Sequence, residues 1–111
     1  MTKKKILLVD DDADFTGLLK LGLENSGPYM IREENNGKGA VRTAREFSPD
    51  LILLDMTLPD IDGYEILRRL KADEILIETP VIFLTAAVPQ YEIESNTDTF
   101  YRHKFISKPA S

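Results

Sequence analysis

The 111-residue sequence has no cysteine and a single histidine, His103. Without cysteine the chain forms no disulfide, no thiolate zinc site and no cysteine nucleophile, and one histidine excludes a histidine-rich metal site. No apolar run approaches the length of a membrane span. Only four apolar residues, 6–9, follow the N-terminal lysines, which is too few for the core of a signal peptide. We therefore expect a cytoplasmic protein with no membrane partner.

Basic residues are also in short supply, with 14 Lys and Arg against 19 Asp and Glu and a net charge of -5. A nucleic-acid binder needs a basic face that replaces phosphate counterions, so we expect no direct nucleic-acid partner. No Gly-rich phosphate loop is present, so a bound nucleotide is not indicated. Hydrophobic residues make up 42% of the chain, which is enough for a core. Length and composition predict one domain over residues 1–111.

Short apolar runs recur along the chain, and helical patterns of apolar residues separate them. Uninterrupted apolar runs are typical of strands that are buried on both faces of a sheet. Their alternation with helices predicts βαβ units, right-handed crossovers and a doubly wound, mostly parallel α/β sheet. The five predicted strands are 6–9, 29–31, 51–54, 81–84 and 105–107.

Three helices are predicted between the strands, each with a recognisable start or stop. Asp12 can cap the first helix, and Gly27-Pro28 ends it. Ser48-Pro49 ends the second, and Asp62 to Glu65 has the spacing of a capping box for the third. Residues 86–103 have few apolar anchors, so we expect only a short or irregular helix there. The predicted core-facing residues are Phe15, Leu18, Leu19 and Leu23, then Ala40, Val41, Ala44 and Phe47, then Ile66, Leu67 and Leu70.

Charged or hydroxyl residues stand at four of the predicted strand ends. Asp10 and Asp11 follow the first strand, and Asp55 ends the third. Thr85 follows the fourth and Lys108 the fifth. Each alone has a simple explanation as a turn residue, a helix cap or a surface charge. Parallel strands bring their carboxyl ends to one rim, where ligands bind in open α/β sheets, so we interpret the five residues as one site.

The residue types at this rim indicate phosphoryl chemistry. Carboxylates packed together repel one another, which favours protonation or a bound cation. Oxygen-only ligands suit Mg²⁺, Mn²⁺ or Ca²⁺, and Mg²⁺ typically takes one or two carboxylates together with waters and a phosphate oxygen. Lys108 adds a second positive charge, and Thr85 can donate to a phosphoryl oxygen. The pattern indicates that a carboxylate at this rim is a nucleophile that accepts a phosphoryl group with the help of a metal.

These residues and their spacing resemble the receiver domain of two-component response regulators, the chemotaxis-type receiver fold. Asp11 and Asp55 are 44 residues apart, and Asp55 and Thr85 are 30 apart, as in that family. The resemblance covers nearly the whole chain and implies a flavodoxin-like, five-stranded parallel sheet in the order 2-1-3-4-5. The matching segments are Leu8 to Asp11, Pro49 to Asp55, Pro59 with Gly63, Phe83 to Ala86, and Ser107 to Pro109.

The resemblance also implies the metal and phosphoryl roles. Asp55 would be the phosphoacceptor and a ligand of Mg²⁺. Asp11 would bind the metal directly, Asp10 largely through water, and Thr57 through its backbone carbonyl.

Three residues near the chain end would form the conformational switch. Thr85 would be the switch hydroxyl and Lys108 the ion-pair partner of the phosphoryl group. Phe105 would be an aromatic switch residue, for which simple packing is an equal alternative. A cis bond is expected before Pro109, because a cis bond to proline costs little.

The sequence departs from the family pattern in three places. Residues 86–103 lack the small-residue pattern that usually precedes the last strand, which puts a fourth helix in question. No fifth helix follows Ser111, so we expect a truncated domain whose bare apolar sheet face favours self-association. Thr57 and Ala87 occupy positions that tune phosphoryl lifetime; neither is acidic or an amide, so fast self-hydrolysis is not expected.

The leading hypothesis is a signalling module that catalyses only its own phosphorylation and dephosphorylation. The donor histidine would belong to a histidine kinase or a phosphotransfer protein, because His103 matches no family role. The output would belong to an effector protein or to a missing output domain. Two alternatives stay open: a receiver-like interaction module without phosphorylation, and a metal-dependent phosphatase. The phosphatase is disfavoured because such enzymes carry a second Asp where Thr57 stands.

Overall fold

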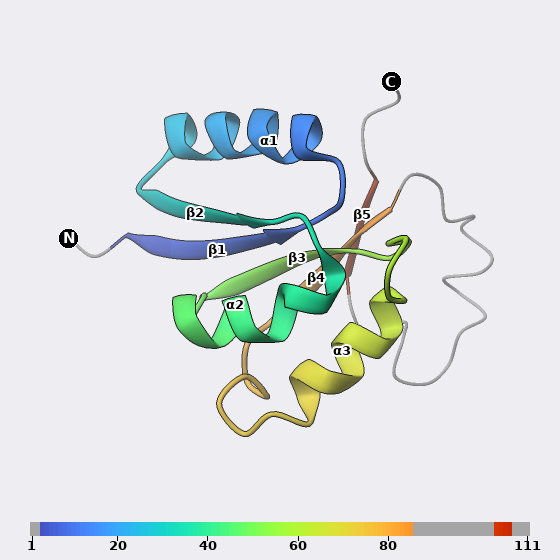
Figure 1. The fold of residues 1–111 in the computed structure, drawn as a ribbon. Helices are drawn as coiled ribbons and strands as arrows, with labels where there is room; N and C mark the ends of the chain where they lie inside the picture. Colours follow the sequence, from blue (N-terminus) through green and yellow to red (C-terminus); the bar gives the residue numbers. More distant parts are fainter. Residues whose placement is uncertain (1–2, 86–103, 108–111) are drawn as a thin grey trace.

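A parallel sheet of five strands, in the order β2-β1-β3-β4-β5, forms the centre of the molecule. The computed structural model describes residues 3–85 and 104–107, with Thr85 and 104–107 described as backbone only. Helix α1 covers one face of the sheet, and α2 and α3 cover the other (Figure 1). The predicted fold class and strand order are confirmed. The strands are β1 (Lys4–Val9), β2 (Tyr29–Glu34), β3 (Leu51–Asp55), β4 (Val81–Thr85) and β5 (Lys104–Ser107), and the helices are α1 (Ala13–Ser26), η1 (Gly37–Gly39, a 3-10 turn), α2 (Ala40–Phe47) and α3 (Gly63–Lys71).

The central strands are buried on both faces, as their uninterrupted apolar sequences predict. Leu7 and Leu8 point to opposite faces of β1, and neither is accessible to solvent. Leu54 of β3 is buried in the same way. Such burial fixes the register of the sheet, because a slip by one residue would exchange the two faces.

Helix α1 begins where the sequence predicts, at Asp12, whose Oδ1 accepts a hydrogen bond from the Phe15 N–H at 3.1 Å. Phe15, Leu19 and Leu23 pack against the core on this face of the sheet. The prediction for Leu18 is wrong, because its side chain is 72% exposed. Phe15, Leu19 and Leu23 follow one another at intervals of four residues, and this row faces the sheet together with the fully buried Thr16.

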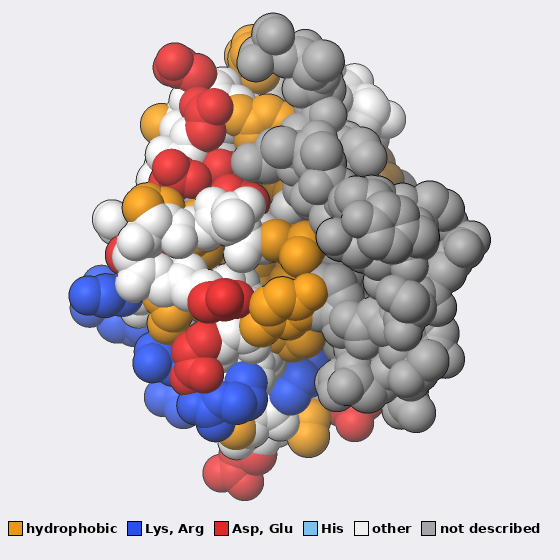
Figure 2. All heavy atoms as spheres, turned by 90° about the vertical axis from the view of Figure 1, so that its right-hand side faces the viewer, with side chains coloured by type: hydrophobic (Ala, Val, Ile, Leu, Met, Phe, Trp, Pro, Cys, Tyr) orange, Lys and Arg blue, Asp and Glu red, His pale blue; other side chains and the backbone are white. Residues whose placement is uncertain are grey.

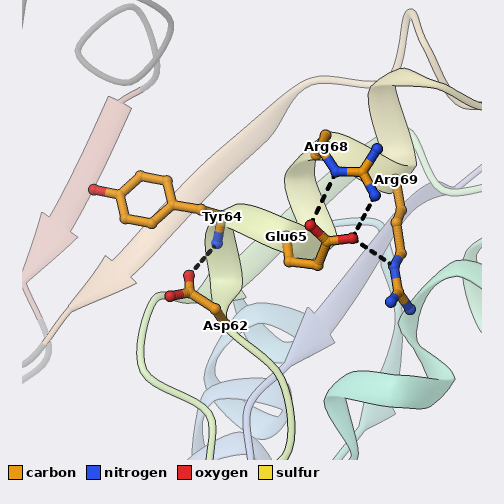
Figure 3. Close-up of polar contacts among 5 residues, drawn as sticks. All are labelled: Asp62, Tyr64, Glu65, Arg68 and Arg69. Atoms are coloured by element: carbon orange, nitrogen blue, oxygen red, sulfur yellow. Dashed lines mark hydrogen bonds and ion pairs between the residues drawn. The ribbon is translucent and has the colours of Figure 1, made fainter.

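Helices α2 and α3 bury the residues that their patterns predict, with Ala44, Ile66 and Leu70 at most 1% exposed. Asp62 caps α3 by accepting from the Tyr64 N–H at 2.7 Å. The predicted capping box is corrected here, because the Glu65 carboxylate instead accepts from the following turn of the helix, as Figure 3 shows.

One further expectation is revised. Strand β2 continues through Glu34 instead of ending at Ile31, because β1 pairs with it along its whole length. The expectation of a bare apolar face stays a prediction, because the side chains of β5 lie outside the described residues. The expectations for residues 86–103, including Ala87 and His103, and for Lys108 and Pro109 lie outside the described residues.

Among the described residues, none of the helices has both the length and the apolar composition needed to span a bilayer.

Candidate functional site

Asp10, Asp11 and Asp55 lie together at the carboxyl edge of the sheet. Strands β1 and β3 are adjacent and parallel, with Val9 opposite Leu54, so the next residues along both strands are Asp10 and Asp55. One carboxylate oxygen from each of the three residues lies within 4.8 Å of the other two. The sequence prediction that these acidic residues meet is therefore confirmed. We call this group the acidic cluster.

Burial within the acidic cluster is uneven. Asp10 is fully buried and Asp55 is 3% exposed, whereas Asp11 is exposed. The cluster lies at the edge at which the strands end. Figure 2, turned so that the right-hand side of Figure 1 faces the viewer, shows Asp and Glu side chains in both its upper and its lower half and Lys and Arg gathered in its lower half. Three oxygen donors, with one side open to water, fit a hard divalent cation that keeps part of its hydration shell.

The loop after Asp55 is held close to the sheet by backbone hydrogen bonds. The Met56 N–H donates to the Leu84 carbonyl at 3.1 Å, and the Met56 carbonyl accepts from the Gly63 N–H at 3.1 Å. The Thr57 N–H donates to Asp55 Oδ1 at 3.1 Å. A side chain at Gly63 would place its Cβ 2.7 Å from the Asp55 carbonyl oxygen. Gly63 is therefore needed for the close approach of α3 to the end of β3.

The same loop is tied to the start of the second helical segment through Asp60. Its carboxylate accepts from the backbone N–H groups of Gly37 at 3.2 Å and Lys38 at 2.9 Å. The Lys38 N–H is the main reason why the pKa of Asp60 is lowered from its usual value of 3.8. An ionised Asp60 thus joins the loop that follows Asp55 to η1.

A polar network lies behind Asp10. The Asp12 N–H donates to Asp10 Oδ1 at 3.0 Å, and the side-chain amide of Asn35 donates to the Asp10 backbone carbonyl at 2.7 Å. Buried Thr16 joins this network. Neither Asn35 nor Thr16 is among the site residues that the sequence predicts. The spacing of Thr16 could have revealed its burial. Thr16 precedes the core-facing Leu19 by three residues and Leu23 by seven, which puts its hydroxyl on the buried side of α1.

For the predicted switch residues Thr85 and Phe105, the structure describes the backbone but not the side chains. Thr85 ends β4, one residue beyond the pair Asp55 and Leu84, so its backbone lies at the same edge as the acidic cluster. Phe105 lies opposite Phe83 in the pairing of β4 with β5. Lys108 is outside the described residues. For Thr57, the N–H contact is seen, and the role of its carbonyl remains a prediction.

The N-terminal turn of α3 carries an aromatic contact and an ion-pair group close to the site. The Tyr64 ring points away from the helix toward the strands (Figure 3) and meets the buried Phe83 ring at 5.9 Å between centroids, tilted by 51°. Glu65 pairs with Arg68 and Arg69 at 2.5 and 3.0 Å. Hydrogen bonds from these two arginines lower the pKa of Glu65 to about 2.

A doubly wound parallel sheet with an acidic cluster at its carboxyl edge defines a class of α/β domain that binds its ligand at the strand ends. The family description "Response regulator receiver domain" matches residues 6–111, and the chain belongs to this family.

Individual relatives agree with this assignment. The phosphate regulon transcriptional regulatory protein PhoB of Pseudomonas aeruginosa is 43% identical over 86 residues, which are 78% of this chain and 37% of PhoB. The chain spans about a third of the length of the first curated relatives it matches.

Two solved structures are also similar. The phosphorylated cyanobacterial phytochrome response regulator RcpA has a TM-score of 0.79 and 31% identity, covering 98% of this chain and 83% of RcpA. The Mn²⁺-bound form of response regulator Rcp1 has a TM-score of 0.77 and 27% identity, covering 97% of this chain and 83% of Rcp1.

Proposed function

We propose that this receiver domain accepts a phosphoryl group on Asp55 from a phosphohistidine of a partner protein, with Mg²⁺ at the acidic cluster. The observation that carries the proposal is the meeting of three carboxylates from two strand ends within 4.8 Å. In the transfer, a carboxylate oxygen of Asp55 forms the new bond to phosphorus while the phosphorus–nitrogen bond of the donor breaks, and imidazole leaves. Asp55 is held for this step by the Thr57 N–H and by the adjoining strand.

Asp10, Asp11, Asp55 and the Thr57 carbonyl would hold the metal. Bound there, Mg²⁺ supplies charge that neutralises phosphoryl oxygens. The exposed position of Asp11 leaves this side of the cluster open to water and to the incoming phosphoryl group. The Mn²⁺-bound form of Rcp1 and the phosphorylated form of RcpA support both parts of the proposal.

Thr85 and Lys108 would contact the phosphoryl group once it is bound, and Phe105 would change its position with them. The catalytic activity of the domain would be limited to its own phosphorylation and dephosphorylation, in the cytoplasm. The donor would be a histidine kinase or a phosphotransfer protein, and the output an effector or an attached domain. PhoB and other longer relatives named as transcriptional regulators support an attached output. Self-association stays a prediction.

Incubation with Mg²⁺ and acetyl phosphate, followed by intact mass measurement, tests the proposal. We expect one phosphoryl adduct per chain in the wild type and none in Asp55→Asn. Asp14→Asn is the matched control, because Asp14 is exposed in the first turn of α1 and lies outside the acidic cluster. An adduct that persists in Asp55→Asn, or no adduct in the wild type, would contradict the proposal. Multiple turnover of phosphoesters would instead favour a phosphatase.

A further inference from the structure

We propose that Asn35 is a positioning residue for the metal site, because its side-chain amide fixes the peptide that links Asp10 to Asp11. This inference rests on the proposed role of the two aspartates as metal ligands. The Asp10 carbonyl belongs to the peptide unit between these residues, and Asn35 Nδ2 donates to it at 2.7 Å. The orientation of that peptide plane sets where the Asp11 side chain begins.

Both backbone groups of Asp10 are held from the end of β2. The Asp10 N–H donates to the Glu34 carbonyl at 3.1 Å, which continues the pairing of β1 with β2 past the last strand residue. The next bond in this direction comes from the Asn35 side chain instead of the backbone. The amide therefore extends the sheet by one bond, at the point where the chain must leave the strand and present a carboxylate.

The remaining contacts fix the direction in which the amide points. A backbone carbonyl only accepts hydrogen bonds, so the atom facing Asp10 must be the NH₂ group of Asn35. The same nitrogen donates to Thr16 Oγ1 at 3.1 Å. The Thr16 hydroxyl has two possible acceptors, Glu33 Oε1 at 2.5 Å and the Ala13 carbonyl at 3.2 Å. Whichever of them takes its one proton, the Thr16 oxygen can still accept from Asn35.

This chain of donors ends on a carboxylate acceptor, Glu33, and is partly shielded from water, since Glu33 and Asn35 are half-buried. Hydrogen bonds to an ionised group are stronger than neutral ones, and linked bonds in a buried site strengthen one another. Thr16 is fully buried, as is Asp10. The network also joins α1 to the end of β2, because Thr16 lies in α1, Glu33 in β2 and Asn35 just after β2. Asp10 and Asp11 are therefore presented by a rigid frame and not by a free loop.

Groups that orient metal ligands from behind typically change metal affinity by about 10- to 100-fold when they are removed. Isothermal titration of Mg²⁺ into Asn35→Ala is therefore expected to show a dissociation constant about 10-fold higher than that of the wild type. Asn36→Ala is the matched control, because Asn36 is the next residue, is exposed and makes no side-chain capping bond. Its dissociation constant should equal that of the wild type.

A second pair of variants separates positioning from stability. Thr16→Val removes the hydroxyl at nearly constant shape, whereas Thr16→Ser keeps it. We expect Thr16→Val to weaken Mg²⁺ binding and Thr16→Ser to restore it. Each titration is made at a temperature at which circular dichroism shows the variant folded. In the wild type, scalar coupling between Asn35 Nδ2 and the Asp10 carbonyl carbon should be detectable by NMR.

Three results would overturn the inference. These are equal Mg²⁺ affinity in Asn35→Ala and Asn36→Ala, a lower melting temperature in Asn35→Ala with unchanged affinity, and the absence of the scalar coupling. A wild type that binds no Mg²⁺ would overturn the proposed metal site, and this role of Asn35 with it. Wild-type binding together with no effect at Asn35 would overturn this inference alone.

Discussion

Glu65 is a partly exposed residue that forms ion pairs with two arginines of the same helix. Its carboxylate accepts hydrogen bonds from Arg68, one turn further along α3, and from Arg69. Both arginines are about half exposed or more, so solvent and salt screen the attraction. The pairing nonetheless lowers the pKa of Glu65 from 4.5 to about 2. A carboxyl whose pKa is lower in the folded state stabilises the fold only while it is ionised.

The expected pH dependence follows from these two pKa values. The stabilisation from Glu65 is fully present above about pH 4.5 and is lost as the pH falls toward 2. Urea unfolding at a series of pH values should show wild type more stable than Glu65→Gln near neutrality, with the difference vanishing at the acid end. Glu74→Gln, at an exposed site after α3, should show no such trend. A difference that is constant with pH would contradict the assignment.

At the scale of the elements, two glycines in helical segments have opposite surroundings. A Cβ at Gly63 would lie 2.7 Å from the Asp55 carbonyl oxygen and 2.9 Å from the Met56 Cα, both of them backbone atoms. A Cβ at Gly17, inside α1, would meet nothing within 4 Å. The first glycine permits a close contact between α3 and β3, whereas the second only weakens its helix.

We therefore expect opposite signs for the same substitution. Gly63→Ala should lower the free energy of unfolding by about 1–3 kcal/mol, because backbone has to move to admit the methyl group. Gly17→Ala should raise it by about 0.4–1 kcal/mol through helix propensity and a less disordered unfolded chain. Denaturant unfolding measures both. A stabilising Gly63→Ala would show that α3 can retreat from β3 at no cost.

The sequence predicts best those elements whose side chains are apolar on every side. Apolar runs such as 51–54 have no polar face, and their shortness favours a central strand over a buried helix. Leu18 was misassigned because α1 has adjacent leucines, and the pattern alone does not tell which of two rows faces the sheet. Glu65 was misassigned because its arginine partners lie in the next turn, where they compete with the capping bond. The second strand was predicted to end at Ile31 because polar residues follow it, and pairing with β1 extends it to Glu34.

At the scale of the whole molecule, the acidic cluster exists only in the folded state. Asp11 and Asp55 are 44 residues apart, and the pairing of β1 with β3 brings them together. A metal that binds there is therefore linked to global stability. In the absence of metal, the same three negative charges repel one another and oppose folding.

Thermal unfolding with and without Mg²⁺ tests this linkage. Mg²⁺ at 100 times its dissociation constant should stabilise the wild type by about 2.7 kcal/mol. Asp11→Asn should melt higher than the wild type in EDTA, because a charge is removed from the cluster, and should gain little from Mg²⁺. Asp14→Asn should respond to Mg²⁺ as the wild type does. An equal Mg²⁺ response in Asp11→Asn would place the metal elsewhere.

The sequence could predict which carboxylates meet, because parallel strands align their carboxyl ends whatever the side chains do. It could not predict what holds those carboxylates in place. Thr16 lies in α1, and Glu33 and Asn35 lie at the end of β2; together they form no motif, so their contact depends on how α1 packs against β2. The uneven burial of Asp10 and Asp11 is likewise a property of packing and not of spacing.

Asp60 has a mechanical consequence for the molecule. Its one carboxylate binds two successive backbone N–H groups of η1, at Gly37 and Lys38, from the loop that begins at Asp55. Gly37 also lies close to this loop, because a Cβ there would lie 2.4 Å from the Ile61 side chain. A displacement of the loop would therefore have to carry η1, and the start of α2 that follows it, or break both hydrogen bonds of Asp60.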